Sequence, residues 1–534
     1  MYSNVFSAGI TGLEAHIIRV EADVSNGLPM FNMVGFLASE VKEARERVRI
    51  ALQNTGFRFP AKRITVSLSP ADLRKDGSGF DLPIAISLLA AFGMIPQQTD
   101  KKILIAGELG LDGKLGGIHG ALAMAQQAKK EGFRVFLLPA VNAREAGMVE
   151  EIDCIGVNSL SEAVEFLRGK GEFEPVRMDY DSILHQYGGE IQEDFDEVYG
   201  QESVKLALEI AVSGGHNVLM IGAPGTGKTM LAKRIPGIMP PLSREEAVEL
   251  TRIYSVAGLL GKELPFVCHR PFRTPHHTIT TAALAGGGKN PVPGEITLAH
   301  KGVLFLDELP EFSPNTLEIL RQPMEEGSIH ISRLGRAFSY PADTIVVAAM
   351  NPCKCGYFPD MRKCRCTRGQ IQGYLSRLSE PLLDRIDICV EMEREIHYGK
   401  GKKGRGTEEM RRRIERTRKI QKRRYRNERI SLNRDLRGRL FEKFCVLGQS
   451  EQNFLEEIQK QAEISARGVQ RILRVARTLA DMEESDRIQE SHVLQASAYK
   501  MISSKYWGYE EMGELYDETG DEFMDLQHFR NRDS

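Results

Sequence analysis

The hydrophobic positions of this chain follow two periods, one typical of strands and one typical of helices. Apolar and polar residues alternate from Ala15 to Ala22 and again from Arg63 to Leu68, which predicts half-buried strands. Apolar residues recur at helical spacing from Ser39 to Leu52, with Ser39 as the expected capping residue. The apolar stretch from Phe80 to Phe92 predicts a helix inside a core. Two shorter apolar runs are expected to be buried strands, at residues 101–106 and 134–138. Residues 1–168 therefore predict a compact α+β domain.

Beyond residue 168 the pattern changes to a polar, irregular stretch, residues 169–194, which is typical of a linker. An amphipathic helix is expected from Glu202 to Ser213, and the apolar run from Val218 to Ile221 predicts a buried strand. This strand breaks at Gly222 into a glycine-rich loop, and a helix is expected from Met230 onwards.

The glycine-rich loop fits the phosphate-binding pattern G-x-x-x-x-G-K-[ST]. Its residues are Gly222, Ala223, Pro224, Gly225, Thr226, Gly227, Lys228 and Thr229. Lys228 is expected to reach the β- and γ-phosphates and the Thr229 hydroxyl to hold Mg²⁺, while backbone N–H groups approach the phosphate oxygens. We place Val198 and Tyr199, just before the predicted helix, among the nucleotide-binding residues. The loop therefore predicts ATP and Mg²⁺ as ligands.

Polar side chains follow two more predicted strands. The apolar run from Gly302 to Leu306 ends in Asp307 and Glu308, and the run from Thr344 to Met350 ends at Asn351. Ligands of open α/β sheets bind beyond the carboxyl ends of the strands. We expect Asp307 to hold Mg²⁺, Glu308 to deprotonate the attacking water and Asn351 to sense the γ-phosphate.

Two arginines are candidates for sensing nucleotide at a distance. Arg385 follows an apolar turn and, if it projects outward, could complete the site of a neighbouring subunit as an arginine finger. Arg377 is the competing candidate, and a surface ion pair is the alternative interpretation of either. Arg467 begins an expected helix at residues 465–480, where we interpret it as a second sensor that reports nucleotide state to a helical lid.

The overall composition mainly excludes some classes of protein. The net charge is −2, so any argument for nucleic acid must rest on local clusters. No run of about 18 apolar residues predicts a membrane span, and the N-terminus lacks the pattern of a signal peptide. Eight cysteines in such a chain favour reduced thiols or a metal site over disulfides, so we expect a cytoplasmic protein.

Four of the cysteines form two close pairs, Cys353 with Cys355 and Cys364 with Cys366. Four thiolates could close a tetrahedral zinc site, but the spacing is tighter than usual, so zinc and free thiols both stay open. His276 and His277 form a weaker metal candidate. A loop that contacts DNA or a neighbouring subunit is the favoured interpretation of this histidine pair.

Local basic clusters could bind the phosphates of DNA. One cluster surrounds the cysteines and consists of Arg362, Lys363, Arg365 and Arg368. Another, residues 400–426, begins with Lys400, Lys402 and Lys403, and a solvated charged helix is the alternative interpretation there. The glycine-rich insertion from Gly286 to Gly294 is the better candidate for a pore loop, with Lys289 and His300 as its phosphate contacts.

The N-terminal domain resembles a known fold. The stretches Gly107–Ala125, Phe136–Asn142 and Arg74–Pro83 look like the proteolytic domain of Lon proteases, a ribosomal S5 domain 2-like fold. Those proteases use a Ser–Lys pair. Here the corresponding helix, Gly120 to Gln127, contains no lysine and Ser78 is displaced, so the resemblance implies a structural or ring-stabilising domain.

The motifs after residue 194 together resemble an AAA+ ATPase, an α/β P-loop core with a helical lid. The stretches Arg270–Thr278, Gly286–His300 and Asn351–Gly356 resemble the magnesium-chelatase-like YifB/ComM family, and the likeness covers roughly residues 1–505. It implies a hexameric ring that moves along branched or single-stranded DNA and promotes branch migration in recombination, notably natural transformation. Lys354 departs from the proline usual there.

The expected organisation is a Lon-like domain, a linker, an ATPase core, a basic helical segment with the lid, and an acidic tail of no assigned function. Their ranges are 1–168, 169–194, 195–395, 396–505 and 506–534. A magnesium-chelatase-type ATPase that remodels a protein or metal-insertion partner is the main alternative. A Lon-like protease and a non-enzymatic nucleotide-gated scaffold are two others.

Overall fold

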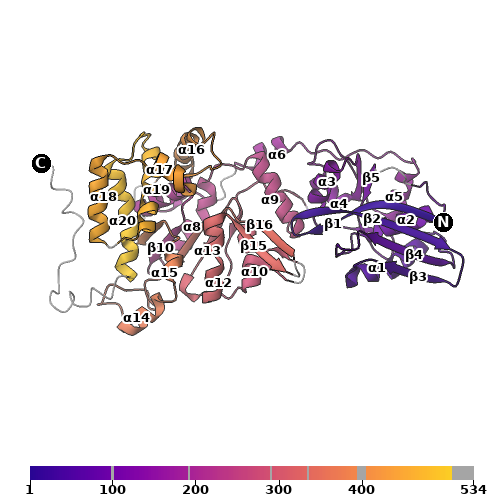
Figure 1. The fold of residues 1–534 in the computed structure, drawn as a ribbon, viewed down its shortest axis with the longest axis horizontal. Helices are drawn as coiled ribbons and strands as arrows, with labels where there is room; N and C mark the ends of the chain where they lie inside the picture. The colour runs from indigo at the N-terminus through magenta and orange to yellow at the C-terminus, as the bar shows by residue number, and fades with distance from the viewer. Residues whose placement is uncertain are drawn as a thin grey trace.

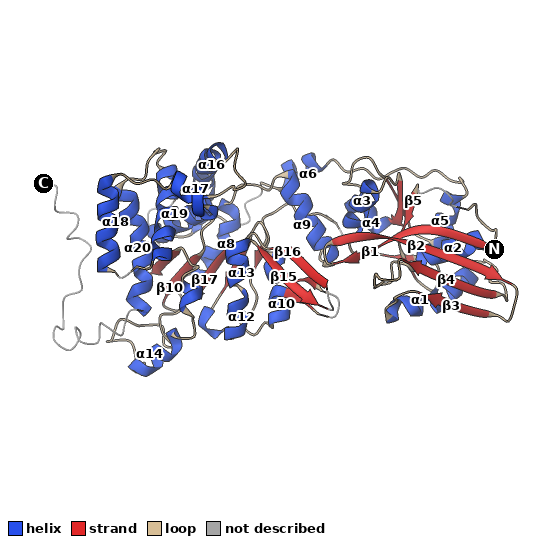
Figure 2. Ribbon diagram, in the orientation of Figure 1, coloured by secondary structure: helices blue, strands red, loops and turns tan. Residues whose placement is uncertain are grey.

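The computed structural model describes residues 1–97, 102–189, 193–261, 263–288, 291–333, 336–393, 405–462 and 464–507. The chain is elongated, with the N-terminal domain at one end and the last helices at the other (Figure 1). Each end has a sheet of its own, and a group of helices lies beyond the sheet at the C-terminal end (Figure 2).

The N-terminal domain is built on a seven-stranded mixed sheet of order β3-β4-β2-β1-β5-β8-β9. Its strands are β1 (Tyr2–Thr11), β2 (Glu14–Ser25), β3 (Met30–Val34), β4 (Arg63–Ser69), β5 (Ile103–Ile105), β8 (Val135–Pro139) and β9 (Asp153–Val157), with a small ribbon β6 (Glu108–Leu109) and β7 (Leu115–Gly116). Its helices are α1 (Ser39–Asn54), α2 (Asp81–Ala91), α3 (Ala121–Lys130), α4 (Ala140–Ala146) and α5 (Leu160–Leu167). Every residue of α2 is buried, which confirms the helix expected inside the core.

Two local expectations are wrong. Ser39 is the first residue of α1 rather than its cap, because Ala38 occupies the cap position and no side chain caps the helix. The linker is not irregular throughout, since α6 (Tyr180–Tyr187) forms within it. Asp179 caps α6 by accepting a hydrogen bond from the N–H of Ser182, and Tyr180 packs edge-on against Phe266 at 6.1 Å between ring centroids. Tertiary packing thus stabilises a helix that the polar sequence does not indicate.

A five-stranded parallel sheet of order β11-β14-β17-β10-β18 forms the centre of the second half. Its strands are β11 (Phe272–Arg273), β14 (Val303–Leu306), β17 (Ile345–Met350), β10 (Val218–Gly222) and β18 (Ile388–Met392). Around it lie α7 (Glu202–Gly214), α8 (Lys228–Ile238), α9 (Arg244–Val256), α10 (Thr281–Ala285), α11 (Glu295–Leu298), α12 (Pro314–Ile319), α13 (Arg321–Glu326), α14 (Arg368–Leu375) and α15 (Glu380–Leu383), and the ribbons β12–β13 (Gly286–Gly287, Val292–Pro293) and β15–β16 (Ser328–Arg333, Arg336–Pro341). Because all five strands of the sheet run parallel, their carboxyl ends meet at one edge and their amino ends at the other.

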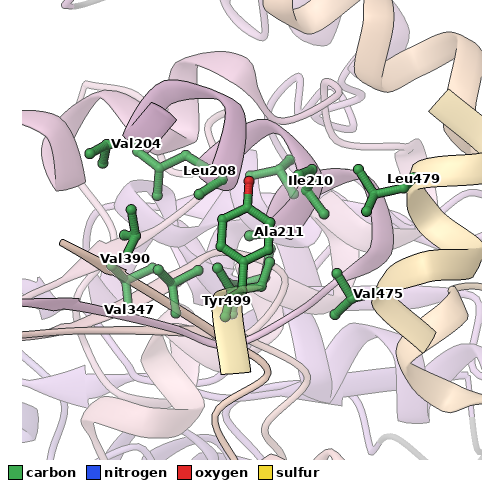
Figure 3. Packing of buried hydrophobic residues seen from close by; sticks show 14 of the residues in the cluster. Val204, Leu208, Ile210, Ala211, Val347, Val390, Val475, Leu479 and Tyr499 are labelled. Carbon is green, nitrogen blue, oxygen red and sulfur yellow. The ribbon is translucent and has the colours of Figure 1, made fainter. Parts of the chain in front are cut away.

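The C-terminal helices are α16 (Thr407–Arg424), α17 (Gly438–Phe444), α18 (Gln449–Gln461), α19 (Ala466–Met482) and α20 (Glu490–Trp507). They share one hydrophobic core with the sheet. Figure 3 shows Leu208 and Ala211 of α7 between Val390 of the sheet and Val475 and Leu479 of α19. Burial at this density means that removing one such side chain costs about 2–5 kcal/mol. The helices are therefore packed firmly on the domain built around the five-stranded sheet.

The two halves of the chain also share a hydrophobic cluster. It contains Ala8 of β1, Leu13 of the turn between β1 and β2, Val256 of α9 and Tyr340 of β16. Phe338 of the same ribbon closes on the turn between β1 and β2, where a Cβ on Gly12 would lie 3.0 Å from its ring. The β15–β16 ribbon thus reaches the N-terminal domain (Figure 1).

Candidate nucleotide-binding site

The glycine-rich loop connects β10 to α8, as predicted, although α8 begins at Lys228 rather than at Met230. Gly225 and Gly227 have φ angles of 79° and 89°, in the left-handed region that favours glycine. A Cβ on Gly222 would lie 2.9 Å from Cβ of Met392 in the neighbouring strand, so only glycine fits there. The loop has the backbone shape and the helix N-terminus that suit a phosphate group.

The ammonium group of Lys228 lies over this loop. Its Nζ donates to the carbonyl oxygens of Gly222 at 2.7 Å and Ala223 at 3.0 Å, and to Oδ1 of Asn351 at 3.1 Å. Burial lowers the pKa of Lys228, while the charges of Asp307 and Glu308 oppose that shift. The loop lysine thus contacts Asn351, which lies 123 residues later in the chain.

Thr229 and Asp307 also meet. Thr229 Oγ1 donates to Asp307 Oδ2 at 2.8 Å, and the N–H of Glu308 donates to Asp307 Oδ1 at 3.0 Å. Hydroxyl and carboxylate oxygens are the ligands that Mg²⁺ prefers, so these two side chains fit that ion. Glu308 has φ 53° and ψ 47°, a left-handed conformation uncommon for glutamate, and such conformations cluster at functional sites.

Val198 and Tyr199 occupy different environments. Val198 is 2% exposed within the core beneath β10, and its carbonyl oxygen accepts a hydrogen bond from Lys205. Tyr199 is 48% exposed. A contact of either residue with nucleotide stays a prediction.

Arg385 and Arg467 lie together, but at the other edge of the sheet. Both line a cavity of about 920 Å³ that also borders Asn217 and Thr344, which precede the amino ends of β10 and β17. The phosphate loop follows the carboxyl end of β10, and a strand of this length spans roughly 15 Å. Neither arginine is therefore placed to touch a nucleotide on its own phosphate loop.

The expectation that Arg385 projects outward is wrong. Its side chain is 9% exposed, and Nη2 lies 2.6 Å from Oε1 of Glu325 on α13. Nη1 donates to the carbonyl oxygen of Pro381, whereas Nε is buried without a hydrogen-bond partner in the described part of the chain. The arginine thus turns toward α13 at a position three residues before β18 begins. Arg377 instead pairs with Glu311 at 2.8 Å on the surface.

The cavity that holds Arg385 is strongly cationic. Ten of the residues that line it are Arg or Lys, and six are Asp or Glu. Nε of Arg471 is likewise buried without a hydrogen-bond partner among the described residues, and burial lowers the pKa of this guanidinium. An excess of desolvated cations favours an anionic ligand.

The four predicted cysteines converge on one point, with all four Sγ atoms within 4.8 Å of one another. Sγ of Cys353 lies 3.3 Å from that of Cys355 and 3.7 Å from that of Cys364. A tetrahedron with Zn–S bonds of about 2.3 Å separates its sulfurs by about 3.8 Å. The cluster therefore has the dimensions to hold a metal ion.

The cysteine loop rests on the phosphate loop. Gly356, between the two cysteine pairs, has φ 83°, and a Cβ added there would lie 2.3 Å from Cδ of Pro224. The two loops are thus in contact at a position where only glycine fits. The basic residues of the first cluster, Arg362, Lys363, Arg365 and Arg368, are exposed.

Much of the second basic cluster serves the fold. Arg405 and Arg413 pair with the buried Glu209 of α7 at 3.1 and 3.0 Å, and Arg418 donates to the carbonyl oxygen of Val212. These contacts hold α16 against α7, so neither proposed interpretation, a DNA-binding run or a solvated helix, describes the whole segment. One exposed face remains, formed by Arg412, Arg416, Lys419 and Arg423. Lys289, Lys400, Lys402 and Lys403 lie outside the described residues.

His300 is wrongly predicted as a phosphate contact. It is 3% exposed, its Nδ1 accepts from the N–H of Asp343 at 3.0 Å and its Nε2 lies 3.2 Å from Glu249. Its position after α11 places it inside the molecule. The sequence places His277 in a loop that contacts DNA or a neighbouring subunit, whereas in the structure its Nδ1 lies 3.4 Å from Oε2 of Glu308. Only the pairing of β11 with β14 could have revealed this contact, and β11 is two residues long.

In the N-terminal domain, Ser78 Oγ donates to Glu108. Helix α3 runs three residues beyond the range expected from sequence and includes Lys129 and Lys130, but Lys129 lies 3.5 Å from Glu151. The hydrogen-bond partner of the Ser78 hydroxyl is therefore a carboxylate. No helix of the described residues is long and apolar enough to cross a membrane.

Comparisons with known proteins identify the family to which the chain belongs. Residues 194–399 match the family model for magnesium chelatase, subunit ChlI, residues 20–142 the model for subunit ChlI of Mg-chelatase, and residues 404–500 the model for its C-terminal part. A shorter similarity, 27% identity over 209 residues, relates 36% of the chain to 19% of the DNA replication licensing factor MCM2 of Arabidopsis thaliana.

Several relatives match almost end to end, among them one from Salmonella typhimurium and one from Haemophilus influenzae. Uncharacterized protein YifB of Salmonella typhimurium is 42% identical over 502 residues, which cover 93% of this chain and 97% of that protein. Competence protein ComM of Haemophilus influenzae is 40% identical over 506 residues, with the same coverage. Together with the site at the carboxyl edge of the sheet, these matches show that the chain belongs to the YifB/ComM family of magnesium-chelatase-like AAA+ ATPases.

Proposed function

We propose that this chain is an ATP-hydrolysing ring motor that acts on DNA, as a branch-migration helicase in recombination or natural transformation. The observation that carries the proposal is the division of catalytic parts between the two edges of one sheet. Family membership implies ATP and Mg²⁺ as ligands. The DNA partner is supported by two relatives, one named a competence protein and the other a DNA replication licensing factor.

At the carboxyl edge, Lys228 binds the β- and γ-phosphates, and Thr229 and Asp307 hold Mg²⁺, which when bound neutralises charge on the phosphates. Glu308 takes the proton of the attacking water, and Asn351 fixes the position of the γ-phosphate or of that water. Replacing Glu308 with Gln removes the base but keeps the side-chain shape. We expect it to abolish ATP turnover while nucleotide still binds.

At the amino edge, Arg385 and Arg467 serve the nucleotide of the neighbouring subunit in a hexameric ring, and Arg385 does so from the wall of the cationic cavity rather than from an outward-projecting side chain. The cationic cavity supports this role, because its two buried Nε atoms lack partners within the described residues. An arginine finger is worth roughly 10³–10⁵ in rate. Arg385→Ala and Lys228→Ala subunits, each inactive alone, should restore some activity when mixed. Arg377→Ala is the matched control, and no rescue at any ratio refutes the shared site.

The DNA substrate is tested by branch migration of a synthetic four-way junction with ATP. Wild type should convert the junction to products, and Glu308→Gln should not. Candidate contacts are the exposed face of α16, the basic cysteine loop and the glycine-rich insertion. Conversion that is equal in the two proteins, or absent in both while ATP is hydrolysed, refutes a DNA motor.

A magnesium-chelatase-type ATPase that remodels a protein or metal-insertion partner is the second candidate. It is favoured by the family models, all three of which are named for that enzyme's subunit. ATP hydrolysis that rises with added DNA counts against it. Hydrolysis that ignores DNA supports it.

Three further assignments belong to this proposal. The N-terminal domain is a Lon-like, non-proteolytic domain, and casein turnover lost in Ser78→Ala would contradict this. The protein works in the cytoplasm. The four cysteines hold one structural Zn²⁺ ion, so the purified chain should contain about one zinc per chain, and Cys355→Ser should lose it.

A further inference from the structure

We propose that a second cavity, between the two halves of the chain, binds a small molecule that carries phosphate or carboxylate oxygens. Its volume is about 370 Å³, which lies in the range of small-molecule sites. It shares no lining residue with the cationic cavity at the amino edge of the five-stranded sheet. This site is independent of the proposed function, because neither ATP hydrolysis nor DNA takes part in it.

Three elements form the walls of this junction cavity. The spacing i, i+3, i+4 and i+7 places four of its lining residues on one face of α3, and they are Ala123, Gln126, Gln127 and Lys130. The turn between β1 and β2 and the start of β2 supply residues 13–16. Helix α9, in the other half of the chain, supplies Arg252 and lies against α3. A ligand in this cavity therefore contacts both halves of the chain.

Arg252 is the strongest indication that the ligand is an anion. Its Nε is buried and has no hydrogen-bond partner within the described residues. Glu249, one turn earlier on α9, is engaged by His300, whose Nε2 lies 3.2 Å from it. A buried N–H group without an acceptor costs free energy. Phosphate and carboxylate oxygens are the acceptors that a guanidinium group binds most strongly.

The other polar side chains of the cavity are also free to bind a ligand. Lys130, His16 and Gln126 make no side-chain hydrogen bond or ion pair within the part of the chain that the structure describes. Two permanent cations, Lys130 and Arg252, and one carboxylate, that of Glu14, are among the lining residues, so the lining has a net positive charge. A cavity with such a charge favours an anion over a neutral molecule.

Part of the wall is apolar. The side chains of Leu13, Ala15 and Ala123 are buried and line the cavity beside the polar groups. A mainly apolar wall with a few polar groups is typical of sites for organic ligands. Because the ligand bridges α3 and α9, its binding should stabilise the contact between the halves by mass action.

The test measures amide hydrogen exchange of the full chain at residues 11–16 and 121–130 while inorganic pyrophosphate or citrate is titrated. Either probe should slow this exchange, about tenfold when its concentration reaches about ten times its Kd. Sodium chloride at equal ionic strength should leave the rates unchanged, because charge screening alone does not fill the cavity.

Two variants locate the binding. Arg252→Gln should weaken binding of the probe about tenfold to 100-fold, as expected for the loss of a charge-assisted hydrogen bond. Lys130→Gln, at an exposed position, should weaken it about twofold to fivefold. Lys129→Gln is the matched control, because Lys129 does not line the cavity and lies 3.5 Å from Glu151. It should bind the probe as wild type does.

Thermal melting without probe shows whether Arg252→Gln folds. If its melting temperature falls, Lys130→Gln decides, because that exposed side chain makes no contact on which the fold depends. The proposal is overturned if neither probe slows exchange in the millimolar range, or if Lys130→Gln responds as Lys129→Gln does. Slowing by pyrophosphate alone supports a phosphate ligand, and slowing by citrate alone supports a carboxylate ligand.

Discussion

Replacing Gly356 with alanine should weaken nucleotide binding from outside the phosphate loop. Gly356 lies in the cysteine loop, and its missing side chain allows Pro224 to pack against it. An alanine Cβ would lie 2.3 Å from Cδ of Pro224. Because φ is 83°, the new residue would also be strained in its own backbone. The substitution therefore pushes the two loops apart.

The magnitude follows from the geometry. Two carbon atoms in contact need about 3.5–4.0 Å, so Pro224 or the cysteine loop must move by more than 1 Å. Overpacking of this kind costs about 1–3 kcal/mol. If the phosphate loop yields, ATP binding weakens by roughly fivefold to 150-fold, at about 1.4 kcal/mol for each factor of ten.

The measurement is a titration with a fluorescent ATP analogue, accompanied by metal content and thermal melting. Gly373→Ala in α14 is the matched control, because a Cβ there meets nothing within 4 Å. Unchanged affinity in Gly356→Ala, with metal content preserved, would refute the idea that the cysteine loop supports the phosphate loop. Equal weakening in Gly373→Ala would show a general loss of stability instead.

Two other predictions concern stability. Asp481 is 1% exposed and accepts hydrogen bonds from Arg424 and Arg477. Asp481→Asn should therefore lower the free energy of unfolding by about 3–5 kcal/mol. Urea unfolding measures this change, and Asp486→Asn, at an exposed position, is the control. Burial raises the pKa of Glu145 from 4.5 to about 7. The unfolded chain thus loses this proton at a lower pH than the folded chain does. The free energy of unfolding should therefore fall as pH rises from about 4.5 to 7, by at most about 3 kcal/mol. Glu145→Gln should remove that dependence.

Each stability prediction has a clear contrary result. A urea midpoint for Asp481→Asn equal to that of Asp486→Asn would mean that the buried arginines find other partners. A Glu145→Gln variant with the same pH slope as wild type would place the responsible carboxyl group elsewhere.

The residues at the carboxyl edge of the sheet could be predicted because each follows a strand of its own. Lys228, Asp307, Glu308 and Asn351 need only the order of strands and the parallel rule to be brought together, and the structure places their polar groups in contact or close by. Each of these residues can therefore be identified from the short stretch of sequence that contains its strand.

Residues whose environment depends on distant partners could not be predicted. Arg385 turns inward toward Glu325, 60 positions earlier in the chain. Arg405 and Arg413 look like nucleic-acid ligands in the sequence, yet both pair with Glu209, about 200 positions away. Charge alone does not distinguish a cation that binds a partner from one that neutralises a buried carboxylate.

The hydrophobic cluster between the two halves of the chain sets how the protein unfolds. Tyr340 and Ile253 of the ATPase half are fully buried in the cluster shared with the N-terminal domain, and Tyr340 is one residue before the end of a ribbon that leads into β17. Cutting the chain at the linker would leave this apolar surface open to water and prone to aggregate. The boundary predicted from sequence near residue 168 should therefore not separate two independently unfolding domains. Both halves should melt in a single cooperative transition.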